Sequence, residues 1–301
     1  MKYFVLTFLP CLLLYPFLIK LFKKYHIGQF IREEGPDLHG YKTGTPTMGG
    51  ILFAVFGALS CFVSGYTIDA LTIVLFAFIG FLDDLLSVLR KKSLGLRAWQ
   101  KLSLQLLFAS ILVFLIKPDT ELQIPFTHGR LDLGNLYWVF AVLLIAGLSN
   151  ASNLTDGLDG LATSVFLTSA IPYWFLLGKS ADSLILLSLC LMAFLFYNVK
   201  PAKIFMGDTG SLVLGALIGT VAVRTSTELL ALLFTSVFIA ETLSVMIQVS
   251  SYKLFKRRVF KMSPIHHHFE LLGWKEERIV QMFSLTNLIV SMLAVLGERI
   301  S

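Results

Sequence analysis

The chain has 301 residues, of which 56% are hydrophobic and only 15% charged, and its mean hydropathy is +0.77. A soluble protein of this length carries closer to a quarter charged residues, so the composition excludes an ordinary soluble enzyme. The net charge of +6 comes without a visible nucleic-acid-binding module, and no nucleic acid is expected as a partner. The basic runs at 90–92 and 256–258 are typical of a membrane surface.

Ten apolar stretches follow one another along the chain, each near the roughly 20 residues that span a lipid bilayer. Because unpaired backbone groups are not tolerated in lipid, such spans must be helical. The predicted helices lie near 3–22, 49–65, 69–87, 99–117, 136–152, 160–178, 182–197, 211–223, 229–252 and 279–297. The first is expected to be a retained helix, because no small-residue cleavage site follows it. The fold class is therefore an all-α polytopic membrane protein, with 1–301 forming a single transmembrane domain.

The lysines and arginines predict the orientation of these helices. Of the 25 basic residues, 19 fall in four loops and the helix ends beside them, at 20–48, 88–101, 198–210 and 253–278. Basic loops face the cytoplasm, so ten helices leave both termini on the outer side. On that outer side, segment 118–135 alternates weakly and predicts a small hairpin.

Three cysteines, Cys11, Cys61 and Cys190, lie inside apolar stretches without a CxxC spacing. They are interpreted as small buried side chains. Neither a disulfide framework nor a zinc site is indicated.

Two adjacent carboxylates, Asp83 and Asp84, end the apolar run FAFIGFLDDLL. A carboxylate in hydrocarbon is costly, so such groups usually mark a path for an ion or a substrate. Adjacent carboxylates also repel each other, and one of the two is expected to hold its proton more firmly.

A second acidic stretch is NLTDGLDGLA at 153–162. If the next helix begins there, Asp156 and Asp159 lie on one face, while Gly157 permits the close backbone approach that a ligand-binding turn needs. Helix capping by Asn153 or Asp156 is the alternative, but it accounts for only one of the carboxylates.

A third stretch, FMGDTGS at 205–211, precedes the predicted helix at 211–223. Glycines on both sides of Asp208, followed by Thr209 and Ser211, are typical of a cradle for a metal-bound phosphate, and a capped turn is the alternative. Mg²⁺ keeps several waters and takes few protein ligands, so one aspartate with phosphate oxygens suits it.

The last cytoplasmic loop contains His266, His267 and His268. Consecutive histidines do not all point one way, which argues against a three-histidine zinc site. Contact with phosphate or orientation of a carboxylate is the functional interpretation, and an exposed loop is the alternative. Glu241 and Gln248, seven residues apart, are expected to line one inward stripe, with Glu241 assigned to packing.

Acids, a magnesium ion, lysines and histidines at the cytoplasmic membrane surface fit the transfer of a phosphate-linked group to or from a lipid. A proton-coupled transporter is the alternative from another class. Carriers bind their substrates near the bilayer midplane between repeated halves, whereas here the carboxylates lie at one edge and no repeat is found. The pattern favours an enzyme.

The chain resembles the polyprenyl-phosphate N-acetylhexosamine-1-phosphate transferase superfamily and, within it, the family that acts on phospho-MurNAc-pentapeptide. The matching stretches are KTGTPTMGG, GFLDD, NLTDGLDGLA, PAKIFMGDTGSL, ETLSVMIQV and FKMSPIHHHFELLGW, between residues 42 and 274. The resemblance implies an Mg²⁺-dependent reaction of UDP-MurNAc-pentapeptide with undecaprenyl phosphate in the bacterial cytoplasmic membrane, for peptidoglycan synthesis. Homodimers are common in this family, so the resemblance also implies a homodimer as a possible assembly. A relative that uses UDP-GlcNAc is the alternative within the superfamily.

The resemblance further implies roles for single residues. Asp83 and Asp84 would lie near the lipid phosphate, Asp208 would bind Mg²⁺, and His266, His267 and His268 would flank the catalytic centre. The implied substrate-binding residues, with Phe205 stacking on uracil, are Lys42, Thr47, Lys101, Asn150, Asn153, Asp156, Gly157, Leu158, Asp159, Asn198, Phe205, Ser211 and Gln248. Ser87 departs from the pattern, because the family usually has lysine there, and one of the basic residues at 90–92 is the candidate replacement. Single and double displacement both stay open.

Overall fold

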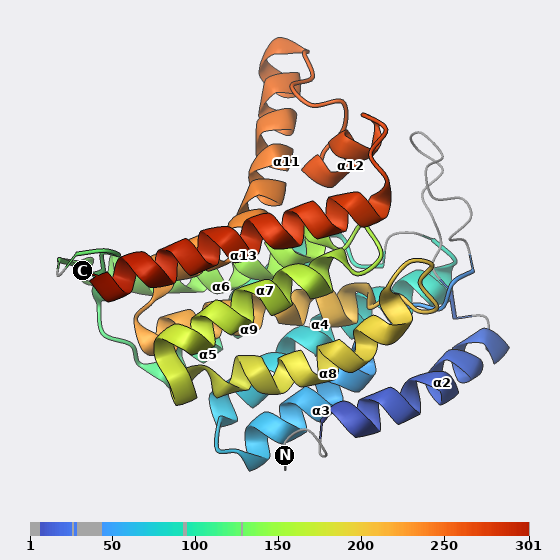
Figure 1. Cartoon of the computed structure of the whole chain (residues 1–301), viewed down its shortest axis with the longest axis horizontal. Helices are drawn as coiled ribbons and strands as arrows, with labels where there is room; N and C mark the ends of the chain where they lie inside the picture. Colours follow the sequence, from blue (N-terminus) through green and yellow to red (C-terminus); the bar gives the residue numbers. More distant parts are fainter. Residues whose placement is uncertain (1–6, 26, 29–43, 93–94, 128, 301) are drawn as a thin grey trace.

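The computed structural model describes residues 7–25, 27–28, 44–92, 95–127 and 129–300 (Figure 1). Its helices are α2 (Phe8–Lys24), α3 (Gly50–Val63), α4 (Thr67–Arg90), α5 (Ala98–Ile116), α6 (Leu136–Thr155), α7 (Leu161–Leu177), α8 (Asp182–Asn198), α9 (Gly207–Thr225), α10 (Glu228–Phe234), α11 (Ser236–Phe255), α12 (Ile265–Glu270) and α13 (Glu276–Ile300). Each of the ten predicted ranges overlaps a helix, so the all-α prediction is confirmed. Short α12 was not predicted.

Membrane-spanning character is clear for part of this set. Within the described ranges, five helical stretches are long and apolar enough to cross a membrane, or six if the bent pair α10 and α11 counts as one span. One of the five, Leu161–Asn198, turns back at the 3₁₀ turn Gly178–Ala181, so that α7 and α8 lie side by side (Figure 1). Ten separate spans stay a prediction.

Helix α9 forms the centre of the bundle. Every residue from Thr209 to Val223 is buried, and α4 and α6 pack along its length. Many of these residues are Gly, Ala, Ser or Thr, which let helix backbones approach closely in membrane proteins. Helices α4 and α9 run antiparallel. Asp84, near the end of α4, contacts the start of α9, whereas Asp69, near the start of α4, contacts Arg224 at the end of α9.

The predicted helix at 229–252 is broken, which corrects the sequence prediction. Helices α10 and α11 meet at an angle of 84°. Asn287 of α13 satisfies backbone groups that the break leaves unpaired: it donates to the Phe234 carbonyl (3.1 Å) and accepts from the Val237 N–H (3.3 Å). As a result α11 projects away from the bundle, with α12 beside it (Figure 1).

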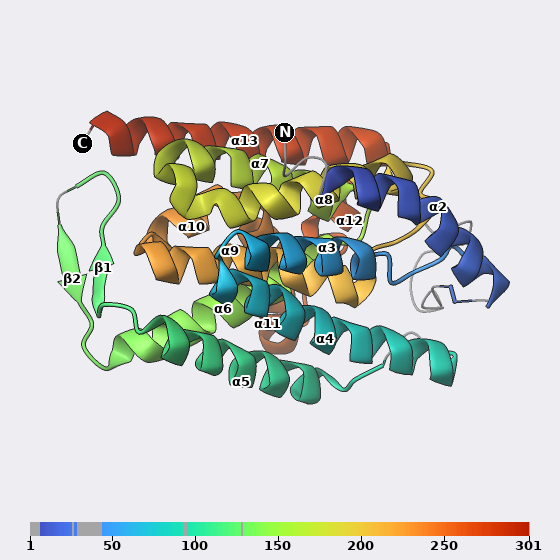
Figure 2. The ribbon, with the colours of Figure 1, turned by 90° about the horizontal axis from the view of Figure 1, so that it is seen from below.

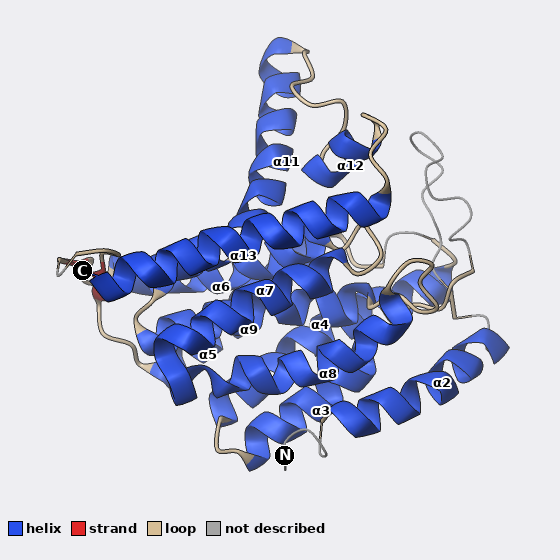
Figure 3. Cartoon of the chain, viewed as in Figure 1, coloured by secondary structure: helices blue, strands red, loops and turns tan. Residues whose placement is uncertain are grey.

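The predicted hairpin is confirmed as antiparallel strands β1 (Glu121–Gln123) and β2 (Arg130–Asp132). It lies at one end of the bundle, opposite the carboxyl end of α4 (Figure 2). The rest of the described chain is helix or connecting loop (Figure 3). The three cysteines are buried and free, as expected from their apolar surroundings.

Candidate active site

Three carboxylates meet where α4 ends and α9 begins. One oxygen from each of Asp83, Asp84 and Asp208 lies within 4.8 Å of the others. Like charges at this separation disfavour full ionisation unless a cation is near. We call these three residues the acidic cluster, and they are the part of the site that the sequence marked most strongly.

Asp84 caps helix α9. Its carboxylate accepts hydrogen bonds from the Asp208 N–H (3.0 Å), the Thr209 N–H (2.9 Å) and the Thr209 hydroxyl (2.6 Å). The first N–H groups of a helix have no partner inside it, and a carboxylate at this end satisfies them. Gly207 permits the contact, because its φ is +68° and a Cβ there would lie 2.4 Å from Asp84 Oδ2.

The start of α9 therefore differs from the prediction. The sequence placed GDTGS before a short helix at 211–223, whereas the helix begins at Gly207 and runs for 19 residues. Asp208 lies in its first turn and not in a preceding loop. The cap from Asp84, distant in sequence, lets the helix begin earlier than the glycines suggested.

Lys101 of α5 and Asn153 of α6 complete a network around Asp208. Lys101 forms an ion pair with Asp208 and donates to the Asn153 side-chain oxygen at 3.0 Å. The Asn153 amide donates to Asp208 Oδ1 and to the Ser211 hydroxyl, both at 2.8 Å. Three helices, α5, α6 and α9, thus bring together Lys101, Asn153, Asp208 and Ser211, all of which were candidate residues.

Of the basic residues after Ser87, Arg90 contacts the backbone and not the acidic cluster. Asp83 accepts from the Leu96 N–H at 2.9 Å, while the Arg90 side chain donates to the Gly95 carbonyl at 2.8 Å. Among the described residues, the ion pair to the acidic cluster comes from Lys101. A cation from the next helix therefore stands beside the carboxylates.

The segment between α6 and α7 is a turn. Helix α6 ends at Thr155 and α7 begins at Leu161, so Asp156 and Asp159 do not share a helical face, which corrects the prediction. The Asp159 carboxylate accepts from the Ala202 N–H at 2.9 Å. Leu158, another candidate, is part of this turn and is buried.

Asn198 and Glu276 hold the same turn from two other helices. Asn198, which is buried, accepts from the Gly160 N–H (3.1 Å) and donates to the Ile204 carbonyl (3.0 Å). The Glu276 carboxylate accepts from the Asp159 N–H at 2.7 Å. In the structure, Asn198 and the Asp159 backbone therefore bind the protein itself and shape the turn at 156–160.

Lys200 adds a cation beside this turn, with its amine 3.1 Å from Glu276 and 3.7 Å from Glu277. Partial burial on its own would lower the pKa of Lys200, but the hydrogen bond and negative charge of Glu276, with those of Glu277 and Asp159, raise that pKa above its ordinary value. Lys200 is therefore a lasting positive charge at this end of the bundle.

Three further candidates lie around α9 and α6. Phe205 pairs through its backbone with the Pro46 carbonyl and the Gly49 N–H, each at 2.8 Å, and this brings buried Thr47 next to the start of α9. Asn150 donates to Gln105 at 2.8 Å. Lys42 lies outside the described residues.

Each of the three histidines has a different partner. His266 Nδ1 lies 3.1 Å from Glu241, and His267 Nδ1 lies 2.7 Å from Glu270. His268 Nδ1 accepts from the Lys261 N–H at 3.1 Å. The three rings thus serve three contacts and do not converge on one point.

Gln248 contacts the loop that follows α11. It accepts from the Val259 N–H (3.0 Å) and the Phe260 N–H (2.9 Å), so it holds the loop after α11 against that helix. With Tyr252 and Met262 it also lines a cavity of about 380 Å³.

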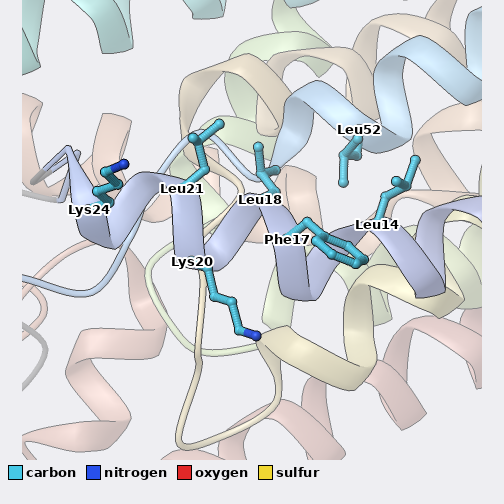
Figure 4. A pocket seen from close by; sticks show the side chains of 7 residues that line it. All are labelled: Leu14, Phe17, Leu18, Lys20, Leu21, Lys24 and Leu52. Carbon is cyan, nitrogen blue, oxygen red and sulfur yellow. The ribbon is translucent and has the colours of Figure 1, made fainter.

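A larger groove of about 480 Å³ runs along α2 and shares no residue with the acidic cluster (Figure 4). It is lined by Leu14, Phe17, Leu18, Lys20, Leu21, Lys24 and Leu52. Apart from Lys20 and Lys24 its lining is apolar, which suits a lipid-facing surface.

Sequence reasoning missed the part that Glu241 and Glu276 play in shaping the site. Glu276 carries no signal, because its partners are distant in sequence. Glu241 carried one: a glutamate within an apolar helix is costly unless it has a polar partner, and its partner is His266.

Comparison with known proteins agrees with this geometry. The family model described as glycosyl transferase family 4 matches residues 66–226. That range includes the acidic cluster, Lys101 and the turn at 156–160. The fold and the site therefore define a membrane-embedded glycosyl transferase.

Individual relatives narrow the assignment. A phospho-N-acetylmuramoyl-pentapeptide-transferase of Thermotoga maritima is 56% identical over 292 residues, covering 96% of each chain. Proteins of the same name from Fervidobacterium nodosum (49% identical, covering 93% of this chain and 92% of the relative) and Staphylococcus carnosus (43%, 96% of each) extend the likeness. The chain belongs to the phospho-N-acetylmuramoyl-pentapeptide-transferase family and is a multi-pass membrane protein.

Proposed function

We propose that this chain transfers phospho-MurNAc-pentapeptide from UDP-MurNAc-pentapeptide to undecaprenyl phosphate, giving undecaprenyl-diphospho-MurNAc-pentapeptide (lipid I) and UMP. The observation that carries the proposal is the acidic cluster with Lys101 on Asp208, in a chain 56% identical to a transferase of that name. One substrate is a lipid and the other is water-soluble, which accounts for carboxylates at the end of an apolar helix.

We further propose ten spans in one domain, 1–301, in the bacterial inner membrane, with both termini outside and the site facing the cytoplasm. Contacts between loops support this arrangement. The loop after α8 meets the turn at 156–160, whereas Tyr66 and Arg224 meet the turn between α7 and α8 at the other end. Alternate loops therefore gather at opposite ends, and basic residues dominate those at the acidic-cluster end.

The acidic cluster suits a divalent cation. Three carboxylates within 4.8 Å offer hard oxygen ligands, which Mg²⁺ prefers. Asp84 already caps α9, so we assign Asp208 as the ligand and Asp83 as its neighbour. Bound Mg²⁺ would neutralise charge on the diphosphate and on the departing UMP.

The protein's own groups would align a single displacement. Asp83, half-buried at the end of α4, orients the lipid phosphate and takes up its proton where it arrives protonated. A phosphate oxygen then forms a bond to the β-phosphorus of the nucleotide sugar, and the bond from that phosphorus to the oxygen retained by UMP breaks. Asn153 and Lys101 keep Asp208 in place during this exchange.

A double displacement, with an aspartate as covalent nucleophile, is the alternative route. It predicts a phospho-sugar adduct on Asp83 or Asp84 when the lipid acceptor is withheld. Mass spectrometry of protein incubated with the nucleotide sugar alone separates the two, because single displacement leaves no adduct.

The experiment that tests the function is UMP release by the purified full chain in detergent, given UDP-MurNAc-pentapeptide, undecaprenyl phosphate and Mg²⁺. We expect UMP with this donor and none with UDP-GlcNAc. Release with UDP-GlcNAc alone would assign another branch of the superfamily. No release with either donor from a folded sample would refute the proposal.

A further inference from the structure

The Glu241–His266 pair is buried, and the acidic cluster does not include it. Glu241 is fully buried and His266 is 1% exposed. His266 Nδ1 lies 3.1 Å from Glu241 Oε1, and the His266 backbone N–H donates weakly to Glu241 Oε2 at 3.4 Å. Glu241 of α11 therefore orients the imidazole ring through Nδ1 and holds the start of α12 through the His266 backbone.

The other ring nitrogen of His266 has a defined environment. Nε2 is buried and has no hydrogen-bond partner among the described residues. A carboxylate on Nδ1 requires the proton there, so neutral His266 has a bare Nε2.

That bare nitrogen faces the backbone of Gly157. A Cβ built on Gly157 would lie 2.2 Å from His266 Nε2 and 2.8 Å from Cε1, so only glycine fits against the ring. Gly157 lies in the turn at 156–160, which Glu276 and Asn198 hold from other sides. His266 is thus the side chain that packs on this turn from α12.

We propose that Glu241 is a positioning residue that acts through His266. The pair braces the turn at Gly157 and so sets the position of the nucleotide-binding side of the site, an inference that rests on the function proposed above. His266 works by contact with the turn, because its Nε2 has no access to substrate in this arrangement.

The test compares the KM for UDP-MurNAc-pentapeptide with kcat in Glu241→Ala, Glu241→Gln and wild-type protein. We expect Glu241→Ala to raise KM at least tenfold and to change kcat less than threefold. Glu241→Gln keeps one acceptor oxygen for Nδ1–H, so its KM should fall between the two. A lowered kcat with unchanged KM would instead make His266 a proton-transfer group and overturn the proposal.

Glu228 offers the matched control. It is also a buried glutamate, it accepts from Tyr137, and it lies at the opposite end of the bundle. Glu228→Ala should lower the thermal unfolding temperature as Glu241→Ala does, but leave KM unchanged. Equal rises in KM for both variants would show general loss of structure and refute the positioning role.

A double-mutant cycle tests the contact with Gly157 itself. Gly157→Ala should raise KM because the methyl group collides with the imidazole, and His266→Ala removes that collision. In the His266→Ala background, the Gly157→Ala change should therefore raise KM by less than half the factor seen alone. Independent, multiplicative effects would disprove the contact. Wild-type protein without any UMP release would instead refute the proposed function. In that case the same cycle is measured as the affinity for UDP-MurNAc-pentapeptide, by calorimetric titration.

Discussion

Helices α4 and α9 are joined by charged groups at both ends, and the two ends differ in their balance of charge. At one end, Arg224 of α9 lies 2.9 Å from Asp69 of α4 and also donates to the Ser180 carbonyl. At the other end, the acidic cluster sets three carboxylates against Lys101. The first end is a balanced ion pair that links helices, whereas the second has excess negative charge that suits a cation and a phosphate substrate.

The difference shows how structural and functional charges are told apart in one membrane protein. Buried Asp69 has its counter-charge, Arg224, in the same contact, because an unpaired buried charge is strongly destabilising. A cluster left with excess charge is held together by the rest of the fold. The Asp84 cap and the Asn153 bridge perform that task here.

The largest expected effect is on activity at the acidic cluster. Asp208→Asn keeps an oxygen for Asn153 or Lys101 but removes the charge assigned to the metal. We expect UMP release to fall by at least about 100-fold, as for loss of a preorganised electrostatic group. The unfolding temperature should stay the same or rise, since one fewer carboxylate lessens the repulsion. A loss of activity that follows a loss of folded protein would contradict this reading.

The next effect is on stability at the balanced end. Asp69→Ala leaves Arg224 without its carboxylate, which should lower the free energy of unfolding by about 3 kcal/mol. Thermal unfolding in detergent measures this, and UMP release per folded molecule should match the wild type. Adding Arg224→Met should recover part of the loss, because no charge is then left unpaired. Reduced activity of the folded fraction would show that this end contributes to the site.

The sequence predicted which residues form the acidic cluster, but not the contacts that hold the helices around it. Asp83, Asp84 and Asp208 stand out because carboxylates are rare in apolar chains, and the helices follow directly from hydropathy. The cap of α9 by Asp84 and the bend at Asn287 were not predictable, because each joins residues more than 45 apart in sequence. A pattern read along the chain shows which residues are unusual but not which of them meet.

Glu241 is a second example of a residue whose partner the sequence does not reveal. Its position in an apolar helix stands out, yet the sequence alone favours packing, because His266 lies 25 residues away across a break in helical structure. Likewise, the sequence favours Asp156 and Asp159 on one helical face, because only the structure shows that α7 does not begin until Leu161. Side-chain partners and element boundaries are set by tertiary contacts, which local patterns do not contain.

A smaller effect concerns stabilisation by metal. A ligand that binds only the folded state at ten times its dissociation constant adds about 1.4 kcal/mol to the free energy of unfolding. Mg²⁺ should therefore raise the unfolding temperature of wild-type protein and of Asp69→Ala alike. Asp208→Asn should show little of this rise, and an equal rise in Asp208→Asn would place the ion elsewhere.

The smallest effect is expected at the hairpin, where Arg130 and Glu121 form an ion pair of 3.2 Å. That distance is close to the 2.9 Å of Asp69 and Arg224, but here the side chains are 64% and 48% exposed, against 25% for Arg224 and 1% for Asp69. Water screens an exposed pair, so Glu121→Gln should change the free energy of unfolding by less than about 1 kcal/mol, and less still in high salt. The backbone pairing of β1 and β2 keeps the hairpin in register. A loss as large as that of Asp69→Ala would mean that separation, and not burial, decides the strength of the charge pairs in this molecule.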